Sequence, residues 1–273
     1  MLEKIKPRLQ ALTTEKIVFL TGAGISAESG IPTFRGEEGY WTVGSKNYHP
    51  MDLATNSAFG ELPDDVWGWY LFRKTVCHRS QPNPGHIALA CFEEVLGDRF
   101  LLVTQNVDGL HLRAGNSMER TYQVHGNIDF MRCWNECCLD LFPIPEEVGT
   151  MERGQKLSAQ QRELLKCPKC GGRSRPHVLW FDECYDEERF RFQSSLKAAF
   201  DCGLLVSVGS SGSTNLPTQM VMGAAGNGSL VVDINPERGP YARMAEASGG
   251  VWFQGGAGAG LKALAQAMGI DLR

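Results

Sequence analysis

A chain of 273 residues lies near the upper size at which one hydrophobic core still forms a single domain, so we expect one domain with insertions or two smaller ones. Hydrophobic residues make up 42% and charged residues 21% of the chain, which excludes an intrinsically disordered or collagen-like protein. With 27 basic and 31 acidic residues the net charge is -4, and we expect no direct contact with nucleic acid. No apolar run approaches the roughly 18 residues of a membrane span, and the first residues do not resemble a signal peptide. We therefore expect a cytoplasmic protein that does not bind membranes; its oligomeric state is left open, a monomer being one option.

Five short runs of aliphatic, β-branched and aromatic residues predict buried strands, because they are apolar on both faces. They are residues 17–20, 100–103, 204–208, 230–234 and 251–253, with a sixth candidate at 177–181 and a shorter strand-like run at 121–124. Helical patterns lie between them at 85–96, 186–199, 216–225 and 261–268. Strands that alternate with helices in this way predict a doubly wound, Rossmann-like α/β fold around a parallel sheet.

Two segments interrupt this alternation. Residues 39–85 carry tryptophans and tyrosines on a helical pattern, and residues 128–175 carry a cysteine cluster and a polar stretch. We expect neither segment to supply a sheet strand, and we predict that together they form a smaller lobe, made of a helical insertion and a zinc module. The Rossmann-like part would then comprise about 1–38, 86–127 and 176–273, within a single catalytic domain of residues 1–273.

The nine cysteines are concentrated in one region, since five of them lie between residues 133 and 170. An odd number of cysteines without a secretory signal indicates reduced thiols rather than disulfides. The pairs Cys133 with Cys137 and Cys167 with Cys170 have the short spacings of a tetrahedral structural zinc site, in which four sulfurs leave no open position for catalysis. Cys138 could replace Cys137 as a ligand, and the sequence leaves this choice open.

A glycine-containing loop, Gly22-Ala23-Gly24-Ile25-Ser26, directly follows the predicted strand at 17–20. Glycines at such a strand-to-helix turn let the backbone approach a pyrophosphate, and the N-terminus of the following helix favours anions. The loop lacks the third glycine of the usual dinucleotide fingerprint, so a simple tight turn is the alternative.

Polar side chains follow two other predicted strands. Gln105, Asn106 and Asp108 come after the run at 100–103, at the carboxyl end of a strand, where open α/β sheets bind ligands. Their amide and carboxylate groups could hold the ribose hydroxyls and the carboxamide of a nicotinamide nucleotide. His125 follows the run at 121–124, and its imidazole titrates near neutral pH, as a general base requires. The other five histidines are interpreted as structural: His49, His78, His86, His111 and His177.

Three long motifs occur in the same order as in the sirtuins, the NAD-dependent protein lysine deacylases, and the chain resembles that family over nearly its whole length. The motifs are residues 22–36, 104–111 and 124–127. The resemblance implies His125 as the catalytic base, with Asn106 and Asp108 positioning water, the ribose and the nicotinamide. It implies NAD as the cofactor, bound by Gly22, Ala23, Gly24, Ser26, Pro32, Phe34, Arg35, Trp41, Gln105, Asn106, Asp108, His125, Gly209, Ser210, Ser211, Asn235, Glu237 and Ala257.

The reaction that this resemblance implies consumes NAD. The acyl oxygen of the modified lysine attacks C1′ of the nicotinamide ribose and expels nicotinamide. His125 then deprotonates a ribose hydroxyl, which attacks the imidate carbon. The products are free lysine, nicotinamide and O-acyl-ADP-ribose.

Two further segments concern the substrate. Tyr70 and Arg73 lie three residues apart, so a phenol and a guanidinium share one face of a predicted helix. They resemble the Tyr-x-x-Arg signature of the class III sirtuins, which remove succinyl and malonyl groups, and an arginine fork binds a carboxylate bidentately. Residues 178–183 resemble the edge to which sirtuins add an acyl-lysine protein substrate as an extended peptide, which implies Val178, Phe181 and Glu183 as substrate-binding residues. Asp182 stands where the family generally has glycine.

Two other functions remain as alternatives. The same site could serve a protein mono-ADP-ribosyltransferase, or the chain could be a non-catalytic NAD-sensing module. His125 favours deacylation over the first alternative, and the presence of every candidate catalytic side chain argues against the second.

Overall fold

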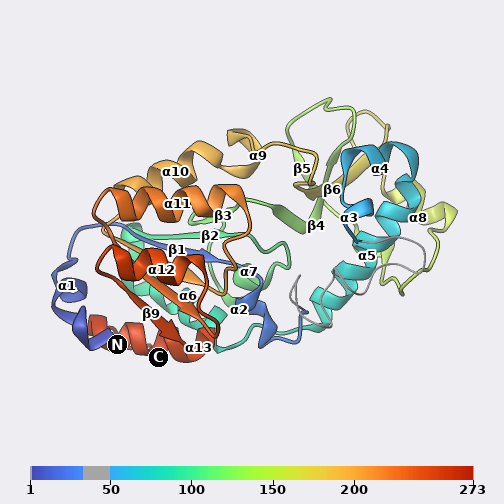
Figure 1. Cartoon of the computed structure of the whole chain (residues 1–273). Coiled ribbons are helices and arrows are strands. Elements are labelled where there is room, and N and C mark those ends of the chain that lie inside the picture. The colour runs from blue at the N-terminus through green and yellow to red at the C-terminus, as the bar shows by residue number, and fades with distance from the viewer. Residues whose placement is uncertain (1, 33–49, 273) are drawn as a thin grey trace.

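The computed structural model describes residues 2–32 and 50–272, which form a larger and a smaller lobe (Figure 1). The larger lobe contains a six-stranded sheet in the order β3-β2-β1-β7-β8-β9, and all its neighbouring strands are parallel. This order, which reverses direction beyond β1, is that of the doubly wound Rossmann fold. The predicted fold class is therefore confirmed. In chain order the strands are β1 (Ile17–Thr21), β2 (Phe100–Thr104), β3 (Thr121–Gln123), β7 (Leu204–Val208), β8 (Leu230–Asn235) and β9 (Val251–Gln254).

The predicted strands of this sheet coincide with the observed ones. Every residue of β1, β2 and β7 is buried. Such strands are apolar throughout because helices cover both faces of the sheet. Successive side chains of β1 accordingly face opposite sides, with Ile17 and Phe19 in one core cluster and Val18 and Leu20 in another.

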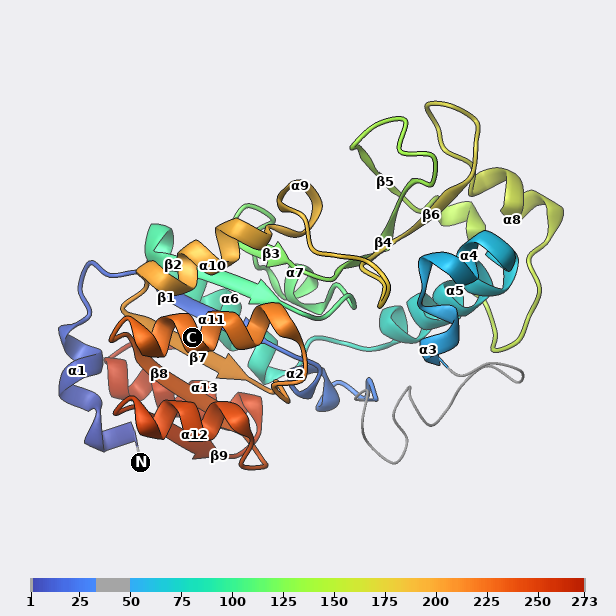
Figure 2. The ribbon, with the colours of Figure 1, turned by 45° about the horizontal axis from the view of Figure 1, so that its top comes forward.

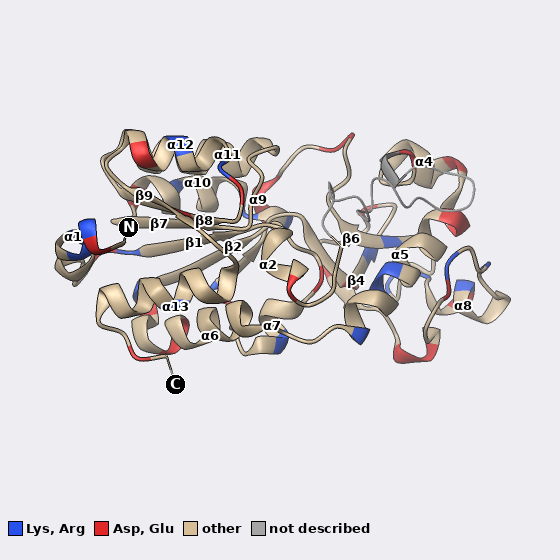
Figure 3. Ribbon diagram, turned by 60° about the horizontal axis from the view of Figure 1, so that its bottom comes forward, with Lys and Arg blue, Asp and Glu red and all other residues tan. Residues whose placement is uncertain are grey.

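Helices cover the two faces of the parallel sheet in two layers (Figure 3). One layer consists of α1 (Lys6–Ala11), α6 (Pro84–Leu96) and α13 (Ala257–Met268), and the other of α10 (Phe192–Asp201), α11 (Asn215–Gly226) and α12 (Pro240–Ala247). The helices predicted at 85–96, 216–225 and 261–268 therefore exist. The larger lobe also contains the short elements α2 (Gly24–Ala27), α7 (Leu110–Ala114), η1 (Leu2–Lys4) and η2 (Gly97–Arg99), whereas η3 (Glu146–Val148) lies between β5 and α8 in the smaller lobe. Among helices of the described ranges, none is both long and apolar enough to cross a membrane.

The single helix predicted at 186–199 is in fact two helices, α9 (Glu187–Phe190) and α10. Arg191 separates them, with a left-handed backbone at φ +54°. The carboxylate of Glu187 accepts hydrogen bonds from the backbone N–H groups of Gln193 and Ser194, at 2.7 and 3.0 Å. A side chain thus satisfies the first amides of α10, which lets a new helix begin there.

The smaller lobe contains a second, antiparallel sheet in the order β5-β4-β6 (Figure 2). Its strands are β4 (Gly126–Cys133), β5 (Leu141–Pro143) and β6 (Ser174–Val178), and its helices are α3 (Pro50–Leu53), α4 (Asn56–Glu61), α5 (Pro63–Arg79) and α8 (Ala159–Leu164). Apolar residues from α4, α5, β4 and the segment after β6 share one core cluster, which includes Phe59, Trp67, Met131 and Trp180.

Two sequence expectations are wrong here. Residues 128–175 do supply strands, and the run at 177–181 ends a strand of the antiparallel sheet instead of joining the parallel one. The first expectation fails because β4 and β6 bury polar side chains, among them Arg132 and Arg175, so neither strand shows a continuous apolar run. The second fails because the apolar residues of the run, Val178 and Trp180, pack in the core cluster of the smaller lobe and not against the parallel sheet. Arg132 and Arg175 both pair with Glu183, which offsets the cost of burying their charge.

Candidate active site

Two loops at the carboxyl edge of the parallel sheet lie in direct backbone contact. The N–H of Gly24 donates to the carbonyl of Gly209 at 2.8 Å. A Cβ on Gly22 or Gly24 would lie 2.8 or 2.7 Å from the backbone of Gly209. Gly209 has a φ of +62°, a left-handed conformation that favours glycine. The loops thus form a cradle of bare backbone, which is what a pyrophosphate needs in order to approach, and NAD fits it.

Two amide side chains that follow β2 form hydrogen bonds with the two loops of this cradle. Gln105 Nε2 donates to Ser210 Oγ at 2.9 Å. Asn106 Nδ2 donates to the carbonyl of Gly22 and to Ser26 Oγ, both at 3.1 Å. The structure therefore brings together the glycine loop and the polar residues that the sequence predicted to meet at this edge.

Asp108 is the buried carboxylate of the group, with 6% of its surface exposed. Its oxygens accept from Ser26 Oγ at 2.7 Å and from the backbone N–H of Leu110 at 2.9 Å. Burial raises the pKa of Asp108, and these two hydrogen bonds act in the opposite direction. Both oxygens are thus fixed in place on the floor of the site.

His125 lies just beyond β3, at the same edge of the sheet. Its Nδ1 is 2.9 Å from the carbonyl oxygen of Gln105. A carbonyl only accepts hydrogen bonds, so Nδ1 carries the proton and Nε2 of the neutral ring carries the lone pair. Burial lowers the pKa of His125 to about 4, while the Gln105 carbonyl acts to raise it. At neutral pH the imidazole is therefore a neutral group with an acceptor at Nε2.

Tyr185, which the sequence analysis did not single out, contacts this acceptor. Its hydroxyl lies 2.8 Å from His125 Nε2. No pattern in the sequence could have shown the contact, because Tyr185 lies in an irregular segment before α9 that only the fold brings to the end of β3.

The remaining predicted cofactor residues take several positions. Asn235, at the end of β8, donates from Nδ2 to the carbonyl of Ser210 at 2.9 Å, while Ser211 bonds Ser213 through their hydroxyls. Ala257 begins α13 with its side chain in the core, and Glu237 is exposed. Ala23 and Pro32 are half-buried, and Phe34, Arg35 and Trp41 lie outside the described residues.

Two histidines interpreted as structural lie beneath the site. His86 Nδ1 accepts from the backbone N–H of Asn83, which closes a capping box at the start of α6. His111 Nε2 is 3.0 Å from Thr21 Oγ1. Burial lowers the pKa of His86 to about 4 and that of His111 as well, so both rings are neutral supports at physiological pH.

Four cysteines lie close together near the end of β4 and the start of β6. The sulfurs of Cys133, Cys137, Cys167 and Cys170 all lie within 4.8 Å of one another. Cys133 and Cys170 are 3.6 Å apart, and Cys137 and Cys167 are 3.7 Å apart. Four thiolates at about 2.3 Å from a tetrahedral zinc would be separated by about 3.8 Å, so the cluster suits zinc. Cys138 is not in the group, which favours Cys137 as the ligand.

We expect purified protein to contain one zinc ion per chain, held by these four residues. Cys137→Ser should lose the metal, because it removes a thiolate from the cluster, whereas Cys138→Ser should retain it. Elemental analysis of both variants measures this directly. Retention by Cys137→Ser together with loss by Cys138→Ser would reverse the assignment.

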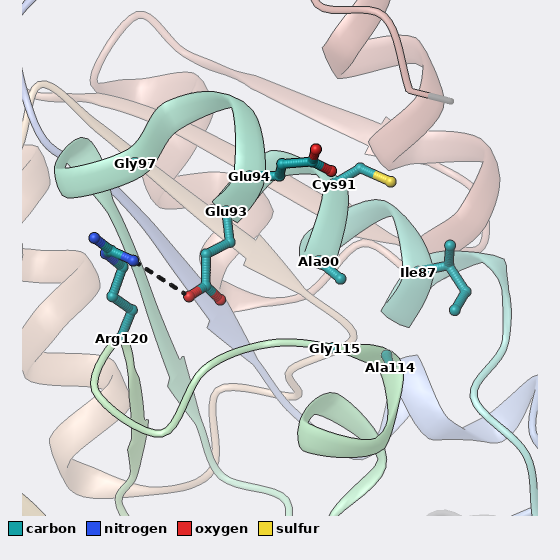
Figure 4. A pocket seen from close by; sticks show the side chains of 9 residues that line it. All are labelled: Ile87, Ala90, Cys91, Glu93, Glu94, Gly97, Ala114, Gly115 and Arg120. Carbon is teal, nitrogen blue, oxygen red and sulfur yellow. Dashed lines mark ion pairs between the residues drawn. The ribbon is translucent and has the colours of Figure 1, made fainter.

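A shallow pocket of about 550 Å³ lies away from this edge, beside α6 and the residues that precede β2 and β3 (Figure 4). Glu93 and Arg120 form an ion pair of 3.8 Å across it. Glu93 also accepts from Asn116 Nδ2 at 2.8 Å and from the backbone N–H of Ser117. These groups fix the loop before β3, and none of them belongs to the predicted site.

Comparison with known proteins agrees with this site. A family model described as the Sir2 family matches residues 22–215. The chain belongs to the Sir2 family. Curated relatives of this sirtuin include an NAD-dependent protein deacylase from Leptospira interrogans, 40% identical over 83% of this chain and 84% of the relative. Another, from Thermus thermophilus, is 38% identical over 90% of this chain and 89% of the relative.

Solved structures resemble the sirtuin chain over nearly its whole length. One is a complex of a Sir2 homologue with NAD, with a TM-score of 0.77 and 32% identity, covering 99% of this chain and 95% of that one. Another is a mutant Sir2 homologue in complex with ADP-ribose, with a TM-score of 0.76 and 31% identity, covering 95% and 94%.

Tyr70 and Arg73 project from α5 of the sirtuin's smaller lobe, and both are buried. The Arg73 guanidinium carbon lies 4.7 Å from the centre of the Trp69 ring and 5.7 Å from that of Tyr70. Tyr70 Oη accepts from Trp180 Nε1 at 2.9 Å, and burial raises the pKa of Tyr70 to about 12. The phenol therefore keeps its own proton, which it can still donate.

The segment after β6 is held on both sides. Leu179 N–H donates to the carbonyl of His125, and Phe181 N–H donates to the carbonyl of Ala54, both at 3.0 Å. Phe181 is 58% exposed, while Val178 is buried. The segment thus begins beside the candidate base and carries an exposed aromatic ring.

Two acidic residues of this segment have internal partners. The carboxylate of Glu183, which is predicted to bind substrate, accepts hydrogen bonds from the Arg175 guanidinium and from the backbone N–H of Trp180, both at 2.9 Å. Asp182 accepts from the backbone N–H groups of Asn56 and Ser57 at 2.7 and 3.1 Å. The departure from the family's glycine therefore caps the start of α4 and ties it to this segment.

Proposed function

We propose that this protein removes succinyl and malonyl groups from lysine side chains, as an NAD-dependent protein deacylase of the Sir2 family. The deacylase activity is supported by the curated relatives, and NAD fits the backbone cradle at the carboxyl edge of the sheet. The observation that carries the reaction is a neutral imidazole, His125, whose acceptor nitrogen lies at that same edge.

The residues of the site have distinct tasks in this proposal. His125 Nε2 accepts the proton of a ribose hydroxyl, because the Gln105 carbonyl holds the other ring nitrogen as a donor. Asp108, fixed by Ser26 and Leu110, orients the nicotinamide half of the cosubstrate. Asn106 positions the ribose and a water molecule. When bound, NAD supplies the electrophilic ribose carbon and leaves as nicotinamide and O-acyl-ADP-ribose.

The preference for an acidic acyl group rests on Tyr70 and Arg73. Arg73 is only 5% exposed and its guanidinium lies over two aromatic rings, so this charge is largely removed from water. A carboxylate can pair with such a group bidentately, and the Tyr70 hydroxyl can add a second donor. An acetyl group offers neither charge nor acceptor geometry to match, so it gains nothing from this pair.

The protein substrate would bind as an extended peptide along the segment after β6. In this proposal the N–H groups of the peptide pair with main-chain carbonyls of residues 178–181, because the N–H groups of Leu179, Trp180 and Phe181 already donate within the chain. This places the acyl-lysine beside His125, to whose carbonyl Leu179 is bonded. The exposed Phe181 ring would cover the neighbouring peptide side chain. Glu183 contributes by shaping the segment through Arg175.

We expect Arg73→Met to lower kcat/KM for a succinyl-lysine peptide by roughly 10- to 100-fold, mainly through KM, because each charge-assisted hydrogen bond is worth roughly 1.5–3 kcal/mol. Activity on the acetyl form of the same peptide should stay constant or rise. Steady-state kinetics on the acetyl, malonyl and succinyl forms measure both effects.

Arg79→Met is the matched control for this substitution. Arg79 lies on the same helix, is 63% exposed and pairs with Glu152 at the surface, where an ion pair contributes little. The acyl preference of Arg79→Met should equal that of the wild-type protein. An Arg73→Met protein with unchanged preference, or an unmodified protein faster on acetyl than on succinyl lysine, would contradict the acyl assignment and leave the deacylase activity intact.

A further inference from the structure

The hydroxyl of Tyr185 occupies the acceptor of His125. Because Nδ1 donates to the Gln105 carbonyl, Nε2 can only accept, and Tyr185 Oη, 2.8 Å away, must be the donor. Burial raises the pKa of Tyr185 to about 12, so the phenol carries its proton throughout the physiological range. Tyr185 is thus a permanent donor and cannot itself serve as a base.

The ring of Tyr185 is packed against α10. Tyr185 stacks on Phe192, the first residue of α10, with the ring centres 5.8 Å apart and an angle of 19° between the planes. It lies against the core cluster between the sheet and the α10–α12 layer. The Tyr241 phenol also acts to raise the pKa of Tyr185. Burial lowers the pKa of His125, and the Gln105 carbonyl acts to raise it.

The backbone on both sides of Tyr185 is anchored. Glu183 is held by Arg175, and Asp186 accepts from the backbone N–H of Arg189 at 2.6 Å. These contacts restrain the residues on either side of Tyr185, so a rotation of its side chain is the smallest change that moves its hydroxyl.

One lone pair at Nε2 cannot serve two donors at once. The function proposed above requires a ribose hydroxyl at Nε2, where the structure has Tyr185. We propose that Tyr185 is a positioning residue for the base: its hydroxyl holds His125 Nε2 in the free enzyme and yields that place to the ribose hydroxyl when the cosubstrate binds. Until the cosubstrate binds, the hydrogen bond from Tyr185 keeps the imidazole neutral and holds its Nε2 in place for the ribose hydroxyl.

Tyr185→Phe tests this inference, because it keeps the ring on Phe192 and removes only the donor. A hydrogen bond to the neutral ring lowers a histidine pKa, so its loss should raise the pKa of His125 by about 0.5–1 in the free enzyme. NMR titration of the imidazole measures this without any turnover. Binding of ADP-ribose should become about two- to ten-fold tighter, since the ligand no longer displaces the phenol.

Tyr122→Phe is the matched control, because Tyr122 also packs against that core cluster and lies three residues before His125, with its ring beside Arg191. Neither the pKa of His125 nor the affinity for ADP-ribose should change in Tyr122→Phe. An unchanged His125 pKa in Tyr185→Phe, or weaker binding of ADP-ribose, would overturn the exchange. Both readouts stand apart from the proposed deacylation, which depends on the role of His125 and is tested by turnover.

Discussion

His125→Ala is expected to lose deacylation by a factor of about 10²–10⁴, the usual contribution of a general base. Removing the imidazole deletes the basic nitrogen Nε2, and the surrounding amides cannot replace it, because an amide oxygen accepts hydrogen bonds but is too weakly basic to take up a proton. Binding of ADP-ribose should persist, because the backbone cradle around Gly209 does not depend on this side chain. Peptide turnover and calorimetric binding separate the two effects.

His78→Ala provides the comparison for this prediction. His78 is 46% exposed and its Nε2 hydrogen-bonds the Asp129 carboxylate on the smaller lobe, so its loss should leave turnover within about two-fold, as expected of an exposed side chain. Turnover close to normal in His125→Ala would remove His125 from its role as the base. Loss of ADP-ribose binding in the same variant would show instead that the ring supports the fold of the site.

Gly209→Ala should both destabilise the protein and abolish binding of NAD. A Cβ at this position would lie 2.4 Å from the backbone nitrogen of Ile25 and 2.6 Å from the carbonyl carbon of Gly24. The left-handed backbone adds roughly 1–2 kcal/mol, and an overpacked contact typically adds about 1–3 kcal/mol. We therefore expect the free energy of unfolding to fall by about 2–5 kcal/mol, measured by chemical denaturation.

Gly223→Ala separates this effect from a general intolerance of alanine. Gly223 lies in α11, and a Cβ there would meet no atom within 4 Å. Alanine in a helix interior is favoured over glycine, so this variant should be more stable by roughly 0.5–1 kcal/mol and bind NAD normally. A Gly209→Ala protein with normal stability and NAD affinity would contradict the close contact of the two loops.

The parallel sheet could be predicted because burial on both faces leaves a direct trace in the sequence. The strand β7, Leu204–Val208, has only one polar residue, and it is buried with the rest. The antiparallel sheet left no such trace. Arg132 and Arg175 lie in its strands and are buried through their pairing with Glu183, a compensation that becomes visible only in three dimensions.

The candidate site was predictable to a similar extent. Its glycines and amides follow strands directly, so the parallel sheet alone brings Gly22, Asn106 and His125 to one edge. The spacing of the cysteines leaves open whether Cys137 or Cys138 binds the metal. The direction of the side chains favours Cys137, whose sulfur lies among the four clustered sulfurs, whereas that of Cys138 does not. Tyr185 lies 60 residues from His125, and their contact depends on the path of an irregular segment, which no periodicity describes.

The central claim is that the edge around His125 couples the consumption of NAD to deacylation of lysine. The most direct measurement incubates one succinyl-lysine peptide with the protein, with and without NAD, and counts nicotinamide and free-lysine peptide by mass spectrometry. We predict equal amounts of both products with NAD and no deacylated peptide without it. Nicotinamide released with ADP-ribose attached to protein and the acyl group retained, or no nicotinamide at all, would contradict this account.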